Sequence, residues 1–284
     1  MGTHGWLTLA TSVVAFLAGM VGGWTAMSLA SKKKHLHTHS WLAAVPLCAG
    51  MFVSLMFIIF IAPALLSPHD RFYSVHDAMR LTAAIGCGLV LILVGYTTYS
   101  GSFFQKRKAL SLLLRFGMDL LACIVIIAAG VRFSVFSPLP GKEYTLGGWA
   151  AFATLAWMLV AMSAVKLLDG LEGAASVLLL VSGVAVFYTT VNSDEHFLNA
   201  FAASLIGASL ASLRFTAFPG RFSLRGPGSA AAGFLFGVLT VLARQKTVAA
   251  LFCLFPLVLV VILVGGSVLS GLERAIFPGR EDKR

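Results

Sequence analysis

Charged residues are scarce in this chain of 284 residues. Only 11% of its residues are charged, whereas 58% are hydrophobic, and its mean hydropathy is +0.91. A soluble globular domain carries charge on about 25% of its residues, so this chain has too few charges to cover a water-facing surface. The composition excludes a soluble enzyme and a disordered chain, and it indicates a helical integral membrane protein.

Cysteine is also rare. The four cysteines, Cys48, Cys87, Cys123 and Cys253, all lie inside apolar runs, with no CxxC spacing and no histidine partner nearby. Cysteines in this setting are typically small buried hydrophobic side chains. The pattern therefore excludes a disulfide scaffold and a cysteine-based metal site.

Acidic residues are outnumbered by basic ones, 11 to 21, which gives the chain a formal net charge of +10. In a soluble protein this excess would suggest nucleic-acid binding. Here the basic residues lie in short loops between apolar runs, and no basic stripe carries interleaved aromatic residues. The excess therefore indicates the Lys and Arg bias of cytoplasmic loops in membrane proteins, and we expect no nucleic-acid partner.

The apolar runs predict the fold. Many approach or exceed the roughly 20 residues that cross a bilayer as a helix, and none shows the alternation of a membrane β-strand. We therefore predict an all-α fold, a polytopic bundle of about nine transmembrane helices that forms a single domain over residues 1–284. The predicted spans are Trp6–Ala30, Trp41–Leu66, Ala78–Tyr99, Ala109–Phe133, Gly148–Leu168, Ala174–Val191, Phe197–Leu213, Ala230–Ala243 and Val248–Leu272.

The charges of the connections predict the orientation. Basic residues gather in alternate connections, with Arg244 and Lys246 as the exception. Because basic loops stay in the cytoplasm, we expect the N-terminus outside and the C-terminus inside, in the inner (cytoplasmic) membrane of the cell. The basic connections are Ser31–Ser40, Ser100–Lys108, Leu213–Ser229 and the tail from Arg274, and the acidic or balanced ones are Ser67–Asp77, Ser134–Gly147 and Asn192–His196.

Two pairs of glycines have a four-residue spacing, Gly19 with Gly23 and Gly233 with Gly237. Small residues at this spacing lie on one face of a helix and let a neighbouring helix approach closely. We expect these glycines to join helices within the bundle rather than to form a dimer face.

Asp169 and Glu172 follow the fifth predicted span. Two carboxylates three residues apart can share one helix face, and such a pair can hold Mg²⁺, which binds hard oxygen ligands. These residues are therefore the candidate metal ligands and catalytic groups. The alternative is a plain turn between two helices, with Gly170 and Gly173 allowing the turn. The spacing alone favours the turn.

The segment Leu213–Ser229 combines basic residues with a Gly-rich turn that opens a helix. Backbone N–H groups in such a turn, flanked by arginine, suit a phosphate group. The candidate phosphate contacts are Arg214, Arg221, Arg225, Gly228 and Ser229. The alternative is a basic loop that only sets the topology, and the two roles are compatible.

Two further lysines, Lys106 and Lys108, are candidate phosphate contacts in the preceding basic connection. The first basic connection instead carries His35, His37 and His39. A helix would splay these histidines apart and no acidic or cysteine ligand lies nearby, so anionic lipid headgroups are the better fit than zinc.

Three charged residues lie within the predicted spans. Arg115 and Asp119 are four residues apart and could pair across one helical turn. Lys166 lies three residues before Asp169 and could neutralise that carboxylate. Charged residues inside a membrane mark candidate functional groups by default.

Taken together, these segments resemble the polyprenyl-phosphate N-acetylhexosamine-1-phosphate transferases, membrane phosphotransferases of the glycosyltransferase family 4 type. The resemblance covers roughly residues 90–280. It rests on Asp169-Gly170-Leu171-Glu172-Gly173, Leu213-Arg214-Phe215-Thr216, Pro219-Gly220-Arg221 and Arg225-Gly226-Pro227-Gly228-Ser229. It implies a bacterial enzyme that uses Mg²⁺ to move a sugar-1-phosphate from a UDP-sugar to a polyprenyl phosphate at the cytoplasmic face.

The departures from the family pattern fall on its chemistry. The family's Asp-Asp pair would fall near Gly95–Tyr99, and no carboxylate occurs between Asp77 and Asp119. A family aspartate that binds metal falls on Gly226, and two family asparagines fall on Ser163 and Lys166. The family also continues past the point where this chain stops, so we expect a C-terminally short member.

These losses lead us to expect a catalytically degenerate homologue, because phosphoryl transfer depends on positioning and on metal-borne charge neutralisation. Such a protein would bind a polyprenyl phosphate or a membrane-protein partner in envelope glycan assembly, with no cofactor. The first alternative is an active transferase with a rebuilt Mg²⁺ site at Asp169 and Glu172. The second is a lipid transporter or flippase subunit, for which Arg115, Asp119 and Lys166 are the only mid-span candidates.

Overall fold

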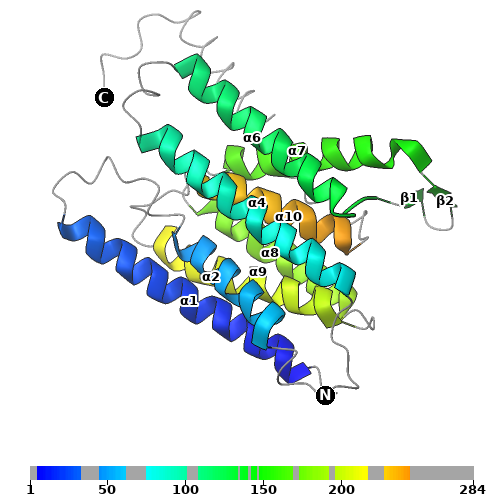
Figure 1. Ribbon diagram of the computed structural model, residues 1–284. Coiled ribbons are helices and arrows are strands. Elements are labelled where there is room, and N and C mark those ends of the chain that lie inside the picture. Colours follow the sequence, from blue (N-terminus) through cyan, green and yellow to red (C-terminus); the bar gives the residue numbers. More distant parts are fainter. Residues whose placement is uncertain are drawn as a thin grey trace, which may run out of the picture.

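The computed structural model describes ten segments of the chain, and most of them are helical (Figure 1). Eight predicted spans each correspond to a helix, and the ninth, Val248–Leu272, lies outside the described residues. The described segments are 5–32, 45–61, 75–100, 108–133, 135–139, 142–145, 147–168, 173–191, 196–216 and 227–243. The helices are α1 (Gly5–Lys32), α2 (Val45–Met56, continued by the π-helical turn Phe57–Ile61), α4 (Val75–Ser100), α6 (Lys108–Ala128), α7 (Ala150–Leu168), α8 (Ala174–Thr190), α9 (His196–Thr216) and α10 (Pro227–Leu242).

A short antiparallel hairpin adds to the all-α fold that was predicted. Strand β1 (Val135–Leu139) pairs with β2 (Lys142–Thr145), with Val135 opposite Thr145 and Phe136 opposite Tyr144. Aromatic and β-branched residues favour strands, and the sequence Pro-Gly between the two favours a turn. The hairpin projects from one end of the bundle, ahead of α7 (Figure 1).

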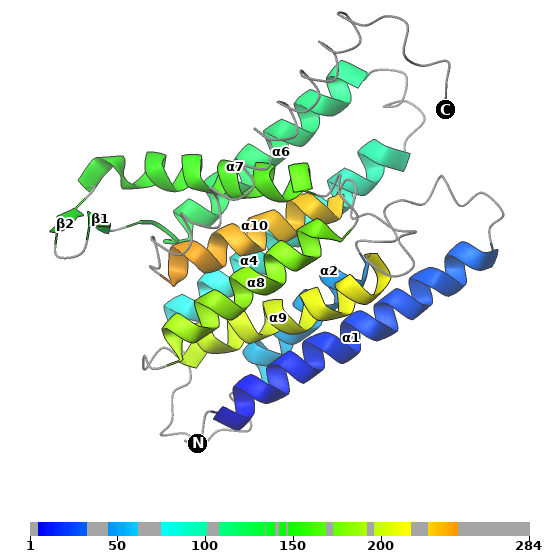
Figure 2. The same ribbon diagram turned by 180° about the vertical axis from the view of Figure 1, so that it is seen from behind.

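The helices run in alternating directions. The C-terminal ends of α1, α4, α7 and α9 lie at the same end of the bundle as the N-terminal ends of α6, α8 and α10 (left in Figure 1, right in Figure 2). The connections predicted to be cytoplasmic leave from these helix ends. The structure therefore brings the helix ends that flank Ser31–Ser40, Ser100–Lys108 and Leu213–Ser229 to a single end of the bundle, which we call the basic end, whereas the tail from Arg274 lies outside the described residues.

Within the described segments, four helices are long and apolar enough to cross a membrane: Gly5–Ser28, His76–Thr97, Gly147–Leu168 and His196–Thr216. The helices Val45–Phe60, Ala174–Thr190 and Gly228–Leu242 are apolar but shorter. In α9, 78% of the most apolar 18-residue window is buried inside the structure. In α1, the buried share of the corresponding window is 22%. Helix α9 is therefore central, and α1 lies at the periphery. The count of nine spans and the orientation stay predictions.

Tryptophans lie near both ends of the outer face of α1. Trp6 and Trp24 are 46% and 71% exposed, with exposed Leu9, Val13 and Leu17 between them. Their separation along a helix is about 27 Å at a rise of 1.5 Å per residue, close to the roughly 30 Å of a bilayer core. Because tryptophan favours the two membrane interfaces, this face of α1 suits contact with lipid.

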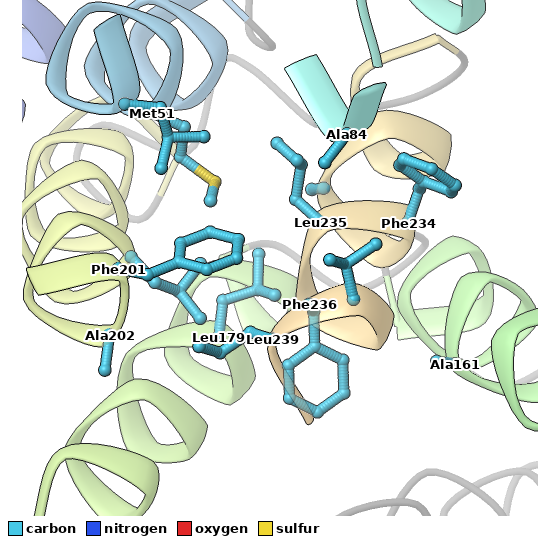
Figure 3. Packing of buried hydrophobic residues seen from close by; sticks show 14 of the residues in the cluster. Met51, Ala84, Ala161, Leu179, Phe201, Ala202, Phe234, Leu235, Phe236 and Leu239 are labelled. Carbon is cyan, nitrogen blue, oxygen red and sulfur yellow. The ribbon is translucent and has the colours of Figure 1, made fainter. Parts of the chain in front are cut away.

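The core lies between the central helices. Figure 3 shows Met51 of α2, Phe201 of α9 and Leu179 of α8 gathered beside Leu235 and Leu239 of α10. Each of these side chains is at most 1% exposed. Burial of this kind fixes the positions of α9 and α10, whose ends at the basic end carry several of the predicted site residues.

Helix α1 reaches α9 through its glycines. A Cβ added at Gly19 would lie 2.6 Å from the Cβ of Ala211, and Gly23 lies against the ring of Phe215. Such short distances leave no room for any side chain. This glycine pair therefore joins helices within the bundle, as predicted.

The second glycine pair joins α10 to α7. A Cβ at Gly233 would lie 2.7 Å from the Cα of Met162, and one at Gly237 would lie 2.7 Å from the Sδ of Met158. The neighbour at Gly233 is main chain and cannot turn aside. This pair, too, lies inside the bundle, as the spacing predicted.

Alanine at Gly233 should destabilise the fold, because its methyl group would overlap the main chain at Met162. Overpacking of this kind costs about 1–3 kcal/mol. Gly117→Ala is the matched control, since Gly117 is helical with nothing within 4 Å of an added Cβ. We expect a lower midpoint of thermal unfolding in detergent, followed by circular dichroism, for Gly233→Ala and no loss for Gly117→Ala. Equal midpoints would contradict the close approach of α7 and α10.

Candidate functional site

A partly buried ion pair joins α6 to α7 towards the basic end. The Nζ of Lys166 donates a hydrogen bond to the Oδ2 of Asp119. The Asp119 side chain is 8% exposed and that of Lys166 is 35% exposed. The spacing within α6 had suggested Arg115 as a partner, and the structure adds Lys166, which is 47 positions away in the sequence.

Two further contacts continue the α6–α7 interface away from this pair. The Sγ of Cys123 lies 3.9 Å from the Sδ of Met162, and the backbone N–H of Phe133 donates to the Oγ1 of Thr154 at 2.9 Å. The ion pair is therefore the contact of this series closest to the basic end. Helix α7 ends two residues later at Leu168, whereas α6 extends further to Lys108.

The electrostatic consequence falls mainly on Asp119. A carboxylate that is buried between membrane helices has lost its hydration, and it stays ionised only with a cation nearby. The ammonium of Lys166 supplies that charge while keeping partial access to water. The pair therefore neutralises the only carboxylate that is buried among the side chains described.

Three buried hydroxyl groups form a second polar cluster, between α8 and α9. The Oγ of Ser176 lies 3.0 Å from the Oγ of Ser212 and 3.3 Å from the Oγ1 of Thr216, and Thr216 also donates to the carbonyl of Ser212. Sequence reasoning missed this cluster, because isolated hydroxyls in apolar runs carry no signal. It ties the start of α8 to the last turn of α9.

Glycine is required where α8 begins. Gly173 has a φ of 74°, a left-handed conformation that side chains disfavour, and no side chain caps this helix end. This conformation agrees with the turn that is the alternative interpretation of the Asp169–Gly173 segment. The candidate carboxylates Asp169 and Glu172 immediately precede it but lie outside the described residues.

The other predicted contacts are only partly placed. Lys106, Arg221 and Arg225 lie outside the described residues, and Lys108 is the first residue of α6. Arg214 is exposed in the last turn of α9. The remaining candidates, Gly228 and Ser229, are buried in the first turn of α10.

The described residues do not fit a Mg²⁺ site. No group of three His, Cys, Asp or Glu side chains that could hold a metal ion occurs within the described segments. The carboxylate that is buried there, Asp119, already has an ammonium as its partner. A hard cation needs carboxylate and carbonyl oxygens, and a neighbouring ammonium repels it.

Alternating apolar helices of membrane-spanning length, with a charged pair buried between two of them, define a helical membrane protein. The sequence model described as "Glycosyl transferase family 4" matches residues 81–244, more than half of the chain. The chain therefore belongs to glycosyl transferase family 4. The matched residues run from α4 to the end of α10 and include both the ion pair and the candidate carboxylates.

Curated relatives agree with this family. The chain is 23% identical over 192 residues to a "Probable undecaprenyl-phosphate N-acetylglucosaminyl 1-phosphate transferase" of Bacillus subtilis, covering 67% of this chain and 51% of the relative. It is 27% and 28% identical to phospho-N-acetylmuramoyl-pentapeptide-transferases of Acetivibrio thermocellus and Bacillus cytotoxicus, covering 74% and 56% of this chain. The matches span 63% and 52% of those two relatives, so the chain covers less than two thirds of the length of each.

Replacement of Lys166 by Gln should destabilise the protein, because the buried Asp119 side chain would lose the ammonium that compensates its burial. Breaking a fully buried pair costs about 3–5 kcal/mol, and the partial exposure of Lys166 lowers our expectation to about 1–3 kcal/mol. The double variant Asp119→Asn/Lys166→Gln should recover most of this loss. The midpoint of thermal unfolding in detergent is measured for the native chain, Lys166→Gln and the double variant.

The control for this cycle is the partly buried pair within α4 formed by Arg80 and Asp77, which are 3.3 Å apart with side chains 33% and 30% exposed. Arg80→Gln should cost less than about 1 kcal/mol, because the Asp77 side chain, unlike that of Asp119, stays 30% exposed. A Lys166→Gln loss no larger than that of Arg80→Gln would show that the interhelical pair contributes no more than a surface pair.

Proposed function

We propose that this protein is a catalytically degenerate homologue of the polyprenyl-phosphate sugar-1-phosphate transferases, placed as a multi-pass protein in the inner membrane. In this role it binds a polyprenyl phosphate, or a membrane-protein partner, during envelope glycan assembly. The observation that carries the proposal is the ion pair between Lys166 and Asp119. In this pair the positive charge of the Lys166 ammonium lies against the buried carboxylate of Asp119.

The sequence supports the same proposal. The family's reaction is expected to need several carboxylates at the cytoplasmic face, and none occurs between Asp77 and Asp119. Transfer of a phosphoryl group relies on metal ions to neutralise charge that develops on its oxygens. With Asp119 paired to an ammonium, Asp169 and Glu172 remain as the candidate ligands in a connection that the sequence predicts to be cytoplasmic.

Lipid-phosphate binding needs no metal, since basic side chains supply the charge. Arg214 is exposed at the basic end, and Arg221 and Arg225 follow it in the sequence. Arginine binds phosphate through two parallel hydrogen bonds, which makes it suited to a lipid phosphate at the membrane surface. The name of the Bacillus subtilis relative includes undecaprenyl phosphate, which makes this the lipid to test first.

A turnover assay tests the loss of catalysis. Purified protein is incubated with UDP-N-acetylglucosamine, undecaprenyl phosphate and Mg²⁺, and released UMP is measured against a detergent blank. We expect no UMP above the blank. Release of UMP by the native chain that disappears in Asp169→Asn would overturn the degenerate reading and establish the alternative, an active transferase with a rebuilt site at Asp169 and Glu172.

A binding assay tests the retained lipid site. Undecaprenyl phosphate binding is measured in nanodiscs by native mass spectrometry, with undecaprenol as the uncharged competitor. Arg214→Ala/Arg221→Ala should weaken binding at least about tenfold, the loss expected for two charge-assisted contacts. Arg132→Ala is the control, because Arg132 is also exposed but caps the far end of α6 by donating to the carbonyl of Ile127. Equal losses in the two proteins would reject the proposed phosphate contacts.

A further inference from the structure

We infer that the buried hydroxyl cluster between α8 and α9 positions Arg214 for contact with a lipid phosphate. The inference deepens the proposed function and rests on it, because it adds positioning residues to the site that Arg214 is proposed to form. Ser176, Ser212 and Thr216 are each at most 1% exposed, so they do not touch a lipid themselves and act through the helix that carries the arginine.

The three hydroxyl groups form one hydrogen-bonded chain with a single direction. Each hydroxyl has one proton to donate, and Thr216 donates its own to the carbonyl of Ser212 at 3.0 Å. Thr216 therefore accepts from Ser176 at 3.3 Å, and Ser176 in turn accepts from Ser212 at 3.0 Å. Ser176 takes part in both hydrogen bonds between the helices, so its loss removes both.

Helix geometry transmits this contact to Arg214. Successive side chains of an α-helix are about 100° apart around its axis, so Ser212 and Thr216 share one face. Arg214 is two residues from each and points to the opposite side. It is exposed, whereas the two hydroxyl residues are buried. The rotation of this turn about the axis of α9 therefore sets the direction of the arginine.

An aromatic contact holds the same turn from another helix. Phe215 is 5% exposed, and its ring lies against Gly23 of α1. The final carbonyls of a helix lack backbone partners and its last turn frays, so side-chain anchors of this kind determine how well an arginine there is ordered. An ordered guanidinium loses less conformational entropy when it binds a phosphate.

Binding of undecaprenyl phosphate in nanodiscs, followed by native mass spectrometry, tests the inference. Ser176→Ala should weaken this binding about threefold to tenfold, the range expected when one or two hydrogen bonds are lost. Thr216→Val should weaken it similarly, because it removes the hydroxyl and keeps the shape. Thr216→Ser keeps the hydroxyl and should bind as the native chain does. Binding of undecaprenol, which lacks the phosphate, should be unchanged in every variant.

The matched control is Ser182→Ala. Ser182 is a buried serine of the same helix, but its hydroxyl donates to the carbonyl of Leu178 within α8 at 2.7 Å. Its loss should leave the affinity for undecaprenyl phosphate unchanged. A positioning role also predicts that Ser176→Ala has no further effect once Arg214 is replaced by alanine, because the effects of residues that act as one unit are not additive.

Two results would overturn the inference. One is a Ser176→Ala protein that binds undecaprenyl phosphate as tightly as Ser182→Ala. The other is an equal loss in the native and the Arg214→Ala backgrounds, which would show that the cluster supports the fold in general rather than Arg214. If Ser176→Ala cannot be purified, Ser212→Ala carries the same test against Ser204→Ala, which removes a buried hydroxyl that donates within α9.

The outcome is separable from that of the proposed function. No binding of undecaprenyl phosphate by the native chain, or binding that is unchanged in Arg214→Ala/Arg221→Ala, would contradict the lipid site itself. Native binding that weakens in Arg214→Ala but not in Ser176→Ala would leave the lipid site intact and reject only its positioning by the hydroxyl cluster.

Discussion

A carboxylate buried between membrane helices requires a cation, and in this protein the cation is the side chain of Lys166. Helix backbones satisfy their own hydrogen bonds within the bilayer, so the arrangement of α6 and α7 depends on side-chain contacts. The Asp119–Lys166 pair is the contact of the α6–α7 series nearest the basic end, and sulfur and hydroxyl contacts continue the interface behind it. The pair therefore compensates the carboxylate that is buried among the described side chains.

The surrounding bundle gives the pair a rigid frame. Glycines on α1 and α10 let neighbouring helices approach to main-chain distance, and the hydroxyl cluster of Ser176, Ser212 and Thr216 ties α8 to α9. These contacts bring the ends of α7, α8 and α9 to one end of the molecule, where the basic connections leave. Membership of glycosyl transferase family 4 fits this arrangement.

Sequence reasoning predicted the local features well and the contacts between distant residues poorly. Hydropathy located the helices, since each described span is one apolar run, and glycine spacing predicted the close packing at Gly19 and Gly233. The partner of Asp119 could not be predicted, because it depends on how α7 lies against α6. The hairpin β1–β2 was also missed, because nine residues of strand propensity between two spans are indistinguishable from a polar loop in a hydropathy pattern.

The most direct measurement is an anomalous difference map from crystals of the native protein grown with Mn²⁺, collected near the manganese edge. The ion pair between Lys166 and Asp119 predicts no anomalous peak at Asp119, with the ammonium in contact with its carboxylate. A manganese peak within bonding distance of the Asp119 oxygens, with Lys166 displaced, would contradict it.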